Sequence, residues 1–177
     1  MIDTPYFHSL YLFRFKQVVE IVSYSTPKGT FDILPEETRP EDVWKASHRW
    51  AYLDEVMRKL SDDYGFSEIR TPIFEHTDLF VRGVGETSDI VSKEMYTFSD
   101  KAERSLSLRP EGTAPVARAF VQGGLKQLGS FHKLFYIGPF FRYDRPQAGR
   151  FRQFHQFGVE AIGKDDAEQD FEIKVKP

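Results

Sequence analysis

The stretch FYIGPFFRYDRPQAGRFRQFHQFGVEAIG, which runs from Phe135 to Gly163, decides the fold of this chain. Both of its ends are rich in aromatic and apolar residues, which predicts β-strands over Phe135–Phe141 and Phe151–Ile162. Residues 145–150 between them are polar, include two arginines, and carry a proline and a glycine, which favour turns. We therefore expect a β-hairpin closed by an arginine-rich loop.

The second of these strands is expected to present two unlike faces, because side chains alternate along a strand. A mixed, partly apolar set suits a core face: Phe151, Gln153, His155, Phe157, Val159 and Ala161. The opposite set suits a ligand surface: Arg152, Phe154, Gln156, Gly158 and Glu160. An aromatic ring can stack on a base, and an arginine can hold a phosphate. The plainer alternative is a solvated face whose charges only keep the protein soluble.

The composition of the 177-residue chain limits the classes of protein to which it can belong. The formal net charge is −3, yet residues 101–155 hold ten lysines and arginines against three acidic residues, which favours a phosphate-bearing ligand there. The chain has no cysteine, which excludes a disulfide framework and a thiolate metal site. No run of eighteen apolar residues occurs, so we expect no membrane span and a cytoplasmic location.

The residues before the hairpin predict one long helix and several short elements. Residues 1–25 are expected to form an N-terminal extension of uncertain structure. Apolar residues recur every three or four positions over residues 41–64, which predicts a helix that stops at Gly65. A strand is expected over Phe66–Phe74, where Pro72 marks an edge, a bulge or a strand end.

The next segments are expected to be mostly loop and hairpin. Residues 77–90 contain two glycines and small polar residues, which favour a loop with room for a short helix. Residues 95–98 and 105–108 are expected to pair as a hairpin. After the hairpin that opens this section, residues 164–172 are expected to begin another helix.

The string Arg109-Pro110-Glu111-Gly112-Thr113 precedes a helix expected over Ala114–Phe120. Thr113 is the expected cap of that helix. Glu111 allows two interpretations. It is either a solvent-facing turn residue or, together with Thr113, part of a site that binds an ammonium group.

Together these segments resemble the N-terminal part of the catalytic domain of histidyl-tRNA synthetase, a class II aminoacyl-tRNA synthetase. Phe141-Arg142-Tyr143-Asp144, with the loop and strand after it, is similar to the second class II motif. The helix over 41–64 and the strand containing Pro72 are similar to the first motif, which builds the dimer interface in the family. The strings at 109–113 and 150–160 resemble segments peculiar to the histidine enzymes.

The resemblance covers residues 27–170 and implies a fold class. We expect an α+β fold with a class II synthetase-like antiparallel sheet flanked by helices. Residues 26–177 would form a partial catalytic domain with an incomplete core. Nothing similar to the family's third motif or anticodon-binding domain occurs, so we expect a fragment with little or no activity alone.

The resemblance also implies roles for particular residues. Arg142 would be the catalytic residue, holding both the ATP α-phosphate and the histidine carboxylate, while Phe154 would stack on adenine and Glu160 would face the imidazole. The implied ATP-binding residues are Arg142, Asp144, Arg150 and Phe154. The implied histidine-binding residues are Glu111, Thr113, Arg142, Gln156 and Glu160. Position 144 departs from the family, which usually has Glu there.

The implied activity is that of a histidine–tRNA ligase. Such an enzyme activates histidine with ATP and Mg²⁺ and transfers it to tRNA(His), and the full-length protein would be a homodimer. No protein ligand for the Mg²⁺ is assigned. The chemistry needs no enzyme nucleophile, because the histidine carboxylate attacks the α-phosphorus of ATP.

Two other classes of protein compete with this interpretation. A synthetase-like regulatory subunit of histidine biosynthesis, the ATP phosphoribosyltransferase regulator, shares the fold and binds histidine without charging tRNA. Retention of the ATP and histidine residues argues against it. A nucleic-acid-binding module without chemistry would explain the basic segment, but it would not explain Glu111, Gln156 and Glu160.

Overall fold

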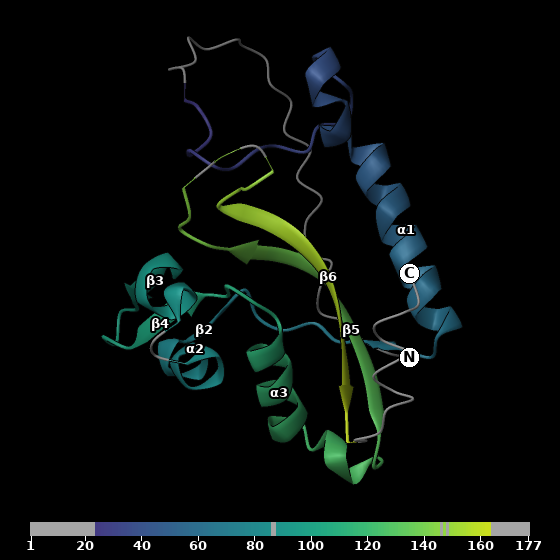
Figure 1. Cartoon of the computed structure of the whole chain (residues 1–177), viewed down its shortest axis with the longest axis vertical. Coiled ribbons are helices and arrows are strands. Elements are labelled where there is room, and N and C mark those ends of the chain that lie inside the picture. Colours follow the sequence, from purple (N-terminus) through teal and green to yellow (C-terminus); the bar gives the residue numbers. More distant parts are fainter. Residues whose placement is uncertain (1–23, 86–87, 146, 148, 164–177) are drawn as a thin grey trace, which may run out of the picture.

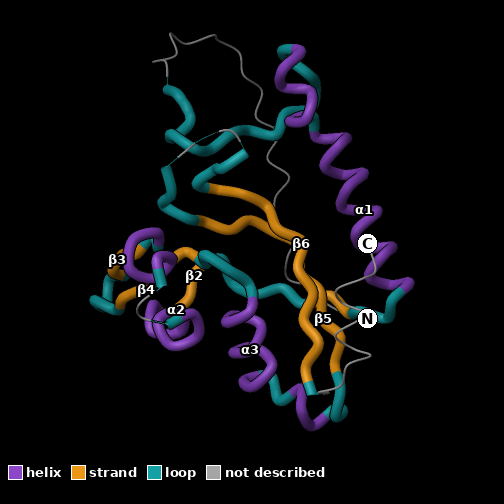
Figure 2. The backbone as a smooth tube through the Cα atoms, in the orientation of Figure 1, coloured by secondary structure: helices purple, strands orange, loops and turns teal. Residues whose placement is uncertain are grey.

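Two three-stranded sheets form the framework of the chain (Figures 1 and 2). The computed structural model describes residues 24–85, 88–145, 147 and 149–163. The first sheet has the strand order β1-β5-β6 and the second has the order β2-β4-β3. Helices lie beside both sheets, so the predicted α+β class is confirmed. The extension over residues 1–25, apart from its last two residues, and the helix expected from residue 164 lie outside the described residues.

The predicted hairpin is the longest feature of the first sheet. Strand β5 (His132–Phe141) pairs with β6 (Gln153–Ile162) in antiparallel register, from His132 opposite Ile162 to Phe141 opposite Gln153. The two-residue strand β1 (Ser67–Glu68) runs parallel to β5. The expected antiparallel sheet is therefore only partly right, because the edge pair is parallel and a second small sheet is present.

The long helix begins later than its apolar pattern predicts. A 3₁₀ turn, η1 (Pro40–Lys45), comes first, and α1 (Ser47–Asp63) follows it. Ala46 between them is extended, because Leu34 forms a bridge with it: the Leu34 amide donates to Lys45 O and the Ser47 amide donates to Leu34 O. Two segments of the chain thus compete for backbone groups that one continuous helix would use.

The predicted stop of this helix at Gly65 is confirmed. Gly65 has a φ of 73°, a left-handed conformation that glycine adopts without steric cost. Its amide donates to Asp62 O, and the Phe66 amide donates to Ser61 O. This pair of hydrogen bonds defines a Schellman ending, which pairs carbonyls that the helix itself leaves free. Phe66 is then buried and leads into β1.

The strand expected over residues 66–74 is divided between the two sheets. The chain leaves β1 before Pro72 and joins the second sheet as β2 (Phe74–His76). Proline lacks an amide hydrogen and fits a position between strands. Strands β3 (Thr97–Ser99) and β4 (Ser105–Leu108) form the predicted hairpin, closed by the Asp100 carboxylate, which accepts from the amides of residues 102 and 104.

The segment 77–90, expected to be a loop with room for a short helix, contains such a helix in its first eight residues. Helix α2 (Thr77–Val84) occupies them and ends before Gly85, whose φ is 99°. A π-helical turn, η2 (Ile90–Glu94), follows. The composition favoured a loop, but packing of α2 against the next long helix stabilises the helical conformation. At this contact a Cβ on Gly83 would lie 2.9 Å from Ala114 Cβ, so the helices approach closely there.

The β5–β6 hairpin lies between two helices (Figure 1). Helix α1 lies on one side, where the Trp50 and His155 rings are 4.7 Å apart. Helix α3 (Thr113–Gln122), followed by the 3₁₀ turn η3 (Leu125–Gln127), lies on the other side. The buried cluster on the α3 side consists of Val116, Leu134, Tyr136 and Phe140.

The expected core face of β6 is only partly right, because both faces of the hairpin carry buried side chains. On the odd-numbered face, Val159 lies opposite Phe135, which is 2% exposed, although His155 on that face is exposed. Apart from Val116 on α3, the side chains of the cluster come from even-numbered residues of β5, which share a face with Phe154, Gln156 and Glu160. The predicted ligand face of β6 therefore continues directly into the core.

The described helices set a limit on membrane association. The longest, α1, has 17 residues, and no helix in the described part of the chain combines the length and apolarity needed to span a bilayer.

Candidate functional site

The N-terminus of α3 is built around the Glu111 carboxylate. Its oxygens accept hydrogen bonds from the Thr113 amide at 2.6 Å and the Ala114 amide at 3.0 Å. The expectation that Thr113 caps the helix is wrong, and so is the interpretation of Glu111 as a mere turn residue. A negative charge here also interacts favourably with the helix dipole. Glu111 thus holds the start of α3 at the edge of the site.

Replacing Glu111 with Ala is expected to lower the free energy of unfolding by about 1 kcal/mol, because two helix-terminal amides lose their acceptor. Urea denaturation followed by circular dichroism measures this change. Glu55→Ala, which removes an exposed carboxylate within α1, is the matched control and should change stability far less. Equal stability of the Glu111 variant and the parent would contradict the capping role.

Thr113 uses its hydroxyl to connect α3 to the hairpin. Its Oγ1 donates to Glu160 Oε1 at 2.8 Å, across 47 positions of sequence. The pKa of Glu160 lies above its usual range, chiefly because the carboxyl is partly buried. The hydrogen bond from Thr113 lowers this pKa, and the nearby charge of Glu111 raises it. Two carboxylates and one hydroxyl, all assigned to the histidine site by resemblance, therefore converge between α3 and β6.

The four residues assigned to ATP line one hollow at the open end of the hairpin. The hollow has a volume of about 550 Å³ and contains Arg142, Asp144, Arg150 and Phe154 in its wall. The remaining lining residues are Ile90, Glu94, Gly149, Phe151 and His155. Residues 94 and 142–144 are tied together because the Tyr143 amide donates to Glu94 O at 2.6 Å.

Arg142 occupies the junction between the two groups of residues. Its Nε donates to Pro110 O at 2.8 Å, which links β5 to the segment before α3. Its guanidinium carbon lies 5.4 Å from the centre of the Phe154 ring. Because only Nε is used in this bond, the two terminal nitrogens keep the fork that suits a phosphate or a carboxylate.

The loop arginines differ in what they contact. Arg150 Nη1 pairs with Asp144 Oδ2 at 3.1 Å, and both lie at the hollow. Arg152 was placed on the predicted ligand face, but its guanidinium stacks 4.0 Å from the Tyr143 ring centre and its amide donates to Gly29 O. Gly29 has a φ of 85°, and a Cβ there would lie 2.8 Å from Arg152 Cγ. Arg152 thus fastens the segment around Gly29 to β6.

Gln156 lies on the same face of β6, between Phe154 and Gly158, and opposite Gly138 on β5. The predicted residues therefore form one continuous surface. It begins at the hollow, passes Arg142 and Gln156, and ends where Glu160 meets Thr113 and Glu111.

Two residues of this surface were not singled out by pattern analysis. Arg109 is 7% exposed and spans three segments: its Nε donates to Pro139 O at 2.9 Å, and its Nη1 donates to Thr71 O at 3.0 Å. Burial lowers the pKa of its guanidinium. Tyr136 is also 7% exposed and lies beneath the carboxylates. Arg109 lies beside Gly138, where an added Cβ would be 2.6 Å from Arg109 Nη2. A single buried arginine leaves no periodic signal in the sequence.

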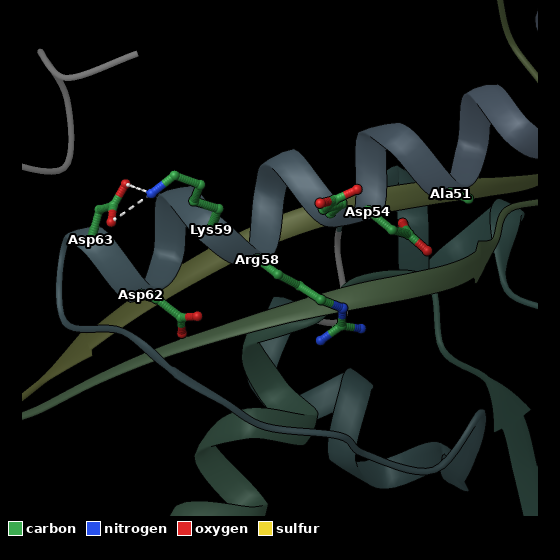
Figure 3. A pocket seen from close by; sticks show the side chains of 7 residues that line it. Ala51, Asp54, Arg58, Lys59, Asp62 and Asp63 are labelled. Carbon is green, nitrogen blue, oxygen red and sulfur yellow. Dashed lines mark hydrogen bonds and ion pairs between the residues drawn. The ribbon is translucent and has the colours of Figure 1, made fainter.

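A second hollow lies on α1 and, unlike the hollow at the hairpin, is lined by a single helix (Figure 3). All of its lining residues come from one helix: Ala51, Asp54, Glu55, Arg58, Lys59, Asp62 and Asp63. Lys59 reaches Asp63 one turn later at 2.9 Å, and Arg58 pairs with Glu68 at 2.8 Å. Both cationic groups of this hollow thus have carboxylate partners, one on α1 and one on β1.

The comparisons with known proteins identify the family of this chain. The family model described as histidyl-tRNA synthetase matches residues 30–175. The chain belongs to this family. A relative from Protochlamydia amoebophila, described as a histidine–tRNA ligase, is 57% identical over 152 residues, covering 86% of this chain and 35% of the relative.

Two solved structures of family members have the same fold. The apo histidyl-tRNA synthetase of S. aureus is 43% identical, covers 85% of this chain and 32% of its own length, and gives a TM-score of 0.66. A Bacillus halodurans protein described as an ATP phosphoribosyltransferase regulatory subunit/histidyl-tRNA synthetase is 25% identical, covers 87% and 36% respectively, and gives 0.65. The chain thus spans about a third of the length of these family members.

Proposed function

We propose that this chain supplies the ATP- and histidine-binding part of a histidine–tRNA ligase. The observation that carries the proposal is the division of the site. Four residues assigned to ATP line one hollow, and three residues assigned to histidine meet beside it at the N-terminus of α3. Arg142 lies between the two groups, where a phosphate and a carboxylate would have to meet for reaction.

On the ATP side, Phe154 offers its ring to adenine, and Arg142 offers its terminal nitrogens to the α-phosphate. Arg150 is paired with Asp144 in the absence of a ligand. Because the pair is largely exposed, little free energy is needed to separate it, and Arg150 is free to turn toward the distal phosphates.

On the histidine side, the carboxylates of Glu111 and Glu160 provide the negative charge that an α-ammonium group and an imidazole require. Glu111 and Thr113 would contact the ammonium group together with Gln156, while Glu160 would accept a hydrogen bond from the imidazole. The partial burial that raises the Glu160 pKa also strengthens its interaction with a bound partner, because the local dielectric is low.

The reaction then follows from position and charge. The histidine carboxylate attacks the α-phosphorus of ATP, a bond forms between carboxylate oxygen and phosphorus, and pyrophosphate leaves with the electron pair of the broken P–O bond. Arg142 neutralises charge on the α-phosphate as it develops. A hydroxyl of the terminal ribose of tRNA(His) then attacks the histidyl carbonyl carbon, and AMP leaves with the electron pair of the broken C–O bond. Holding the two reactants in line supplies most of the rate enhancement, and no protein nucleophile takes part.

Mg²⁺ is proposed to enter with ATP as a bound counter-ion. The described residues contain no group of three or more potential metal ligands from His, Cys, Asp or Glu. Mg²⁺ usually binds through one or two carboxylates together with substrate phosphates, and Glu94 and Asp144 lie in the wall of the hollow. The ion would offset phosphate charge there.

The ligase is favoured over the regulatory alternative by the ATP hollow, since a histidine sensor needs no adenine-stacking ring or phosphate-binding arginine. We also propose that the whole protein works in the cytoplasm as a homodimer. Apolar side chains of α1 and of the segment after Pro72 support the dimer, because they remain exposed in the single chain: Tyr52, Leu53, Val56, Ile73 and Phe74.

Calorimetry with ATP·Mg²⁺ and with histidine tests the proposal directly on this chain. Both ligands should bind, and histidine should bind far more tightly than lysine or phenylalanine. Exchange of labelled pyrophosphate into ATP that requires histidine would show that the chain also carries out the activation step. Binding of RNA without binding of ATP or histidine would instead favour the nucleic-acid-binding alternative and contradict the ligase.

Glu160→Gln is expected to weaken histidine binding about tenfold or more, because a hydrogen bond to a charged acceptor is lost. ATP affinity should stay within about twofold of the parent. The folded-state pKa of Glu160 is raised, so the ionised carboxylate opposes folding once the pH exceeds that pKa. The melting temperature of the variant at pH 7 should therefore be equal or higher.

Glu55→Gln, which neutralises an exposed carboxylate on α1, is the matched control for this experiment. It should change neither affinity. Equal loss of histidine and ATP binding in the Glu160 variant, or no loss of either, would count against the assignment of Glu160 to the imidazole.

A further inference from the structure

The ligand face of β6 has a gap at Gly158, and the phenol of Tyr136 fills it. Tyr136 and Gly158 are direct cross-strand partners. A Cβ on Gly158 would lie 2.3 Å from Tyr136 Cζ and 2.4 Å from its hydroxyl oxygen. Real Cβ atoms do not approach this closely, so the ring lies across the strand where a side chain of residue 158 would be.

The same hydroxyl-bearing end of the ring also contacts the segment that leads into α3. A Cβ on Gly112 would lie 2.2 Å from Tyr136 Cζ and 2.4 Å from its hydroxyl oxygen. Gly112 is the residue between Glu111 and Thr113. The Tyr136 ring is thus held in a slot between two glycines, one on β6 and one at the start of α3, and its thickness sets the distance between these elements.

This slot places the phenol among the residues proposed to bind histidine. Gln156 and Glu160 flank Gly158 on the same face of β6, so the ring lies between their side chains. Burial and the nearby charges of Glu160 and Glu111 raise the pKa of Tyr136 to about 12. The hydroxyl therefore stays protonated near neutral pH and can donate a hydrogen bond.

We propose that Tyr136 is a specificity-determining residue whose ring forms the floor of the histidine site and whose hydroxyl donates a hydrogen bond to the bound amino acid. This inference rests on the proposed function. The ring would fix the spacing of Glu160 and Gln156 from the Glu111–Thr113 segment, and that spacing would set the size of the amino acid that fits.

The plainer role for Tyr136 is that of a core aromatic, since its ring centre is 5.7 Å from that of Phe140. A purely structural role and a specificity role predict different effects of substitution on ligand binding. Core packing requires the ring but not its hydroxyl, and it requires no selective effect on one ligand. Comparison of histidine affinity with ATP affinity separates the two roles, because the hollow that contains Phe154 lies at the other end of the surface.

The test uses the whole chain with two variants and a matched control. Gly158→Ala forces the ring out of its slot and should weaken histidine binding about tenfold or more, with ATP binding unchanged within about twofold. Tyr136→Phe keeps the ring, removes only the hydroxyl, and should weaken histidine binding about threefold to tenfold. Gly129→Ala is the control, because a Cβ there meets its nearest atom at an ordinary 3.7 Å.

The calorimetric results distinguish a specificity role of Tyr136 from a role in core packing alone. Selective loss of histidine affinity in both variants supports the inference. Histidine binding by the parent with no loss in either variant overturns the role of Tyr136 and leaves the ligase proposal intact. Parallel loss of histidine and ATP affinity in the Gly158 variant, with no loss in Tyr136→Phe, assigns Tyr136 to the core alone. Failure of the parent chain to bind histidine overturns both proposals.

Discussion

Replacing Arg142 with Ala is expected to weaken the binding of both ATP and histidine, each by at least about thirtyfold. Arg142 lies between the ATP hollow and the Glu111–Thr113 segment, and its terminal nitrogens face no competing protein acceptor among the described residues. One guanidinium would then serve the α-phosphate and the histidine carboxylate together. Histidine-dependent pyrophosphate exchange, where the parent shows it, should fall below detection.

Loss of both ligands sets this variant apart from the others. Glu160→Gln should affect histidine alone, so the two variants together map the two halves of the site. Arg104→Ala is the matched control, because Arg104 is an exposed arginine that pairs with Asp100 in the β3–β4 turn. An Arg142 variant that keeps parental affinity for either ligand would show that this arginine does not join the two halves.

Arg109→Leu is expected to lower the free energy of unfolding by about 3 kcal/mol or more. The guanidinium donates to Pro139 O and Thr71 O and lies 4.5 Å from the Phe140 ring centre. Leucine fills part of the volume but leaves two carbonyl groups without their donor in a buried place. Because Arg109 connects β5 with the segments before β2 and α3, the loss should spread through the site.

Urea denaturation of this variant is best compared with Arg70→Leu. Arg70 is exposed and pairs with Glu68, so its loss should change stability far less than the loss of Arg109. A similar effect of the two substitutions would mean that Arg109 is not the structural link proposed here. Retention of ATP binding in the Arg109 variant at low temperature would show that the hollow survives the loss of stability.

Local pattern predicted those elements that local chemistry controls. The β5–β6 hairpin follows from two apolar strands around a loop with proline and glycine, and the end of α1 follows from Gly65, which adopts a left-handed conformation easily. The β3–β4 hairpin is another case, because Asp100 closes its own turn within four residues. Each of these features depends on contacts between near neighbours in sequence.

The errors occur where distant segments compete for the same groups. The start of α1 was misplaced because Leu34 holds Ala46 in an extended conformation. The position of the short helix allowed within residues 77–90 was also not predicted, because α2 depends on packing against α3. Thr113 was expected to cap α3, but its hydroxyl is used by Glu160 on β6, and Glu111 caps the helix instead. No periodicity within a single segment contains this information.

The sequence by itself determined the α+β class, the hairpin that carries the site, the alternation that places Phe154, Gln156 and Glu160 on one face, and the resemblance that identified the family. Tertiary structure alone decided that both faces of the hairpin carry buried side chains, which residue caps α3, and which segments Arg109 and Tyr136 contact. The physical reason is the separation in sequence between the residues that interact. Alternation, turns and caps act over a few residues, whereas the floor and links of the site depend on side chains brought together from segments that lie 20 or more positions apart in the chain.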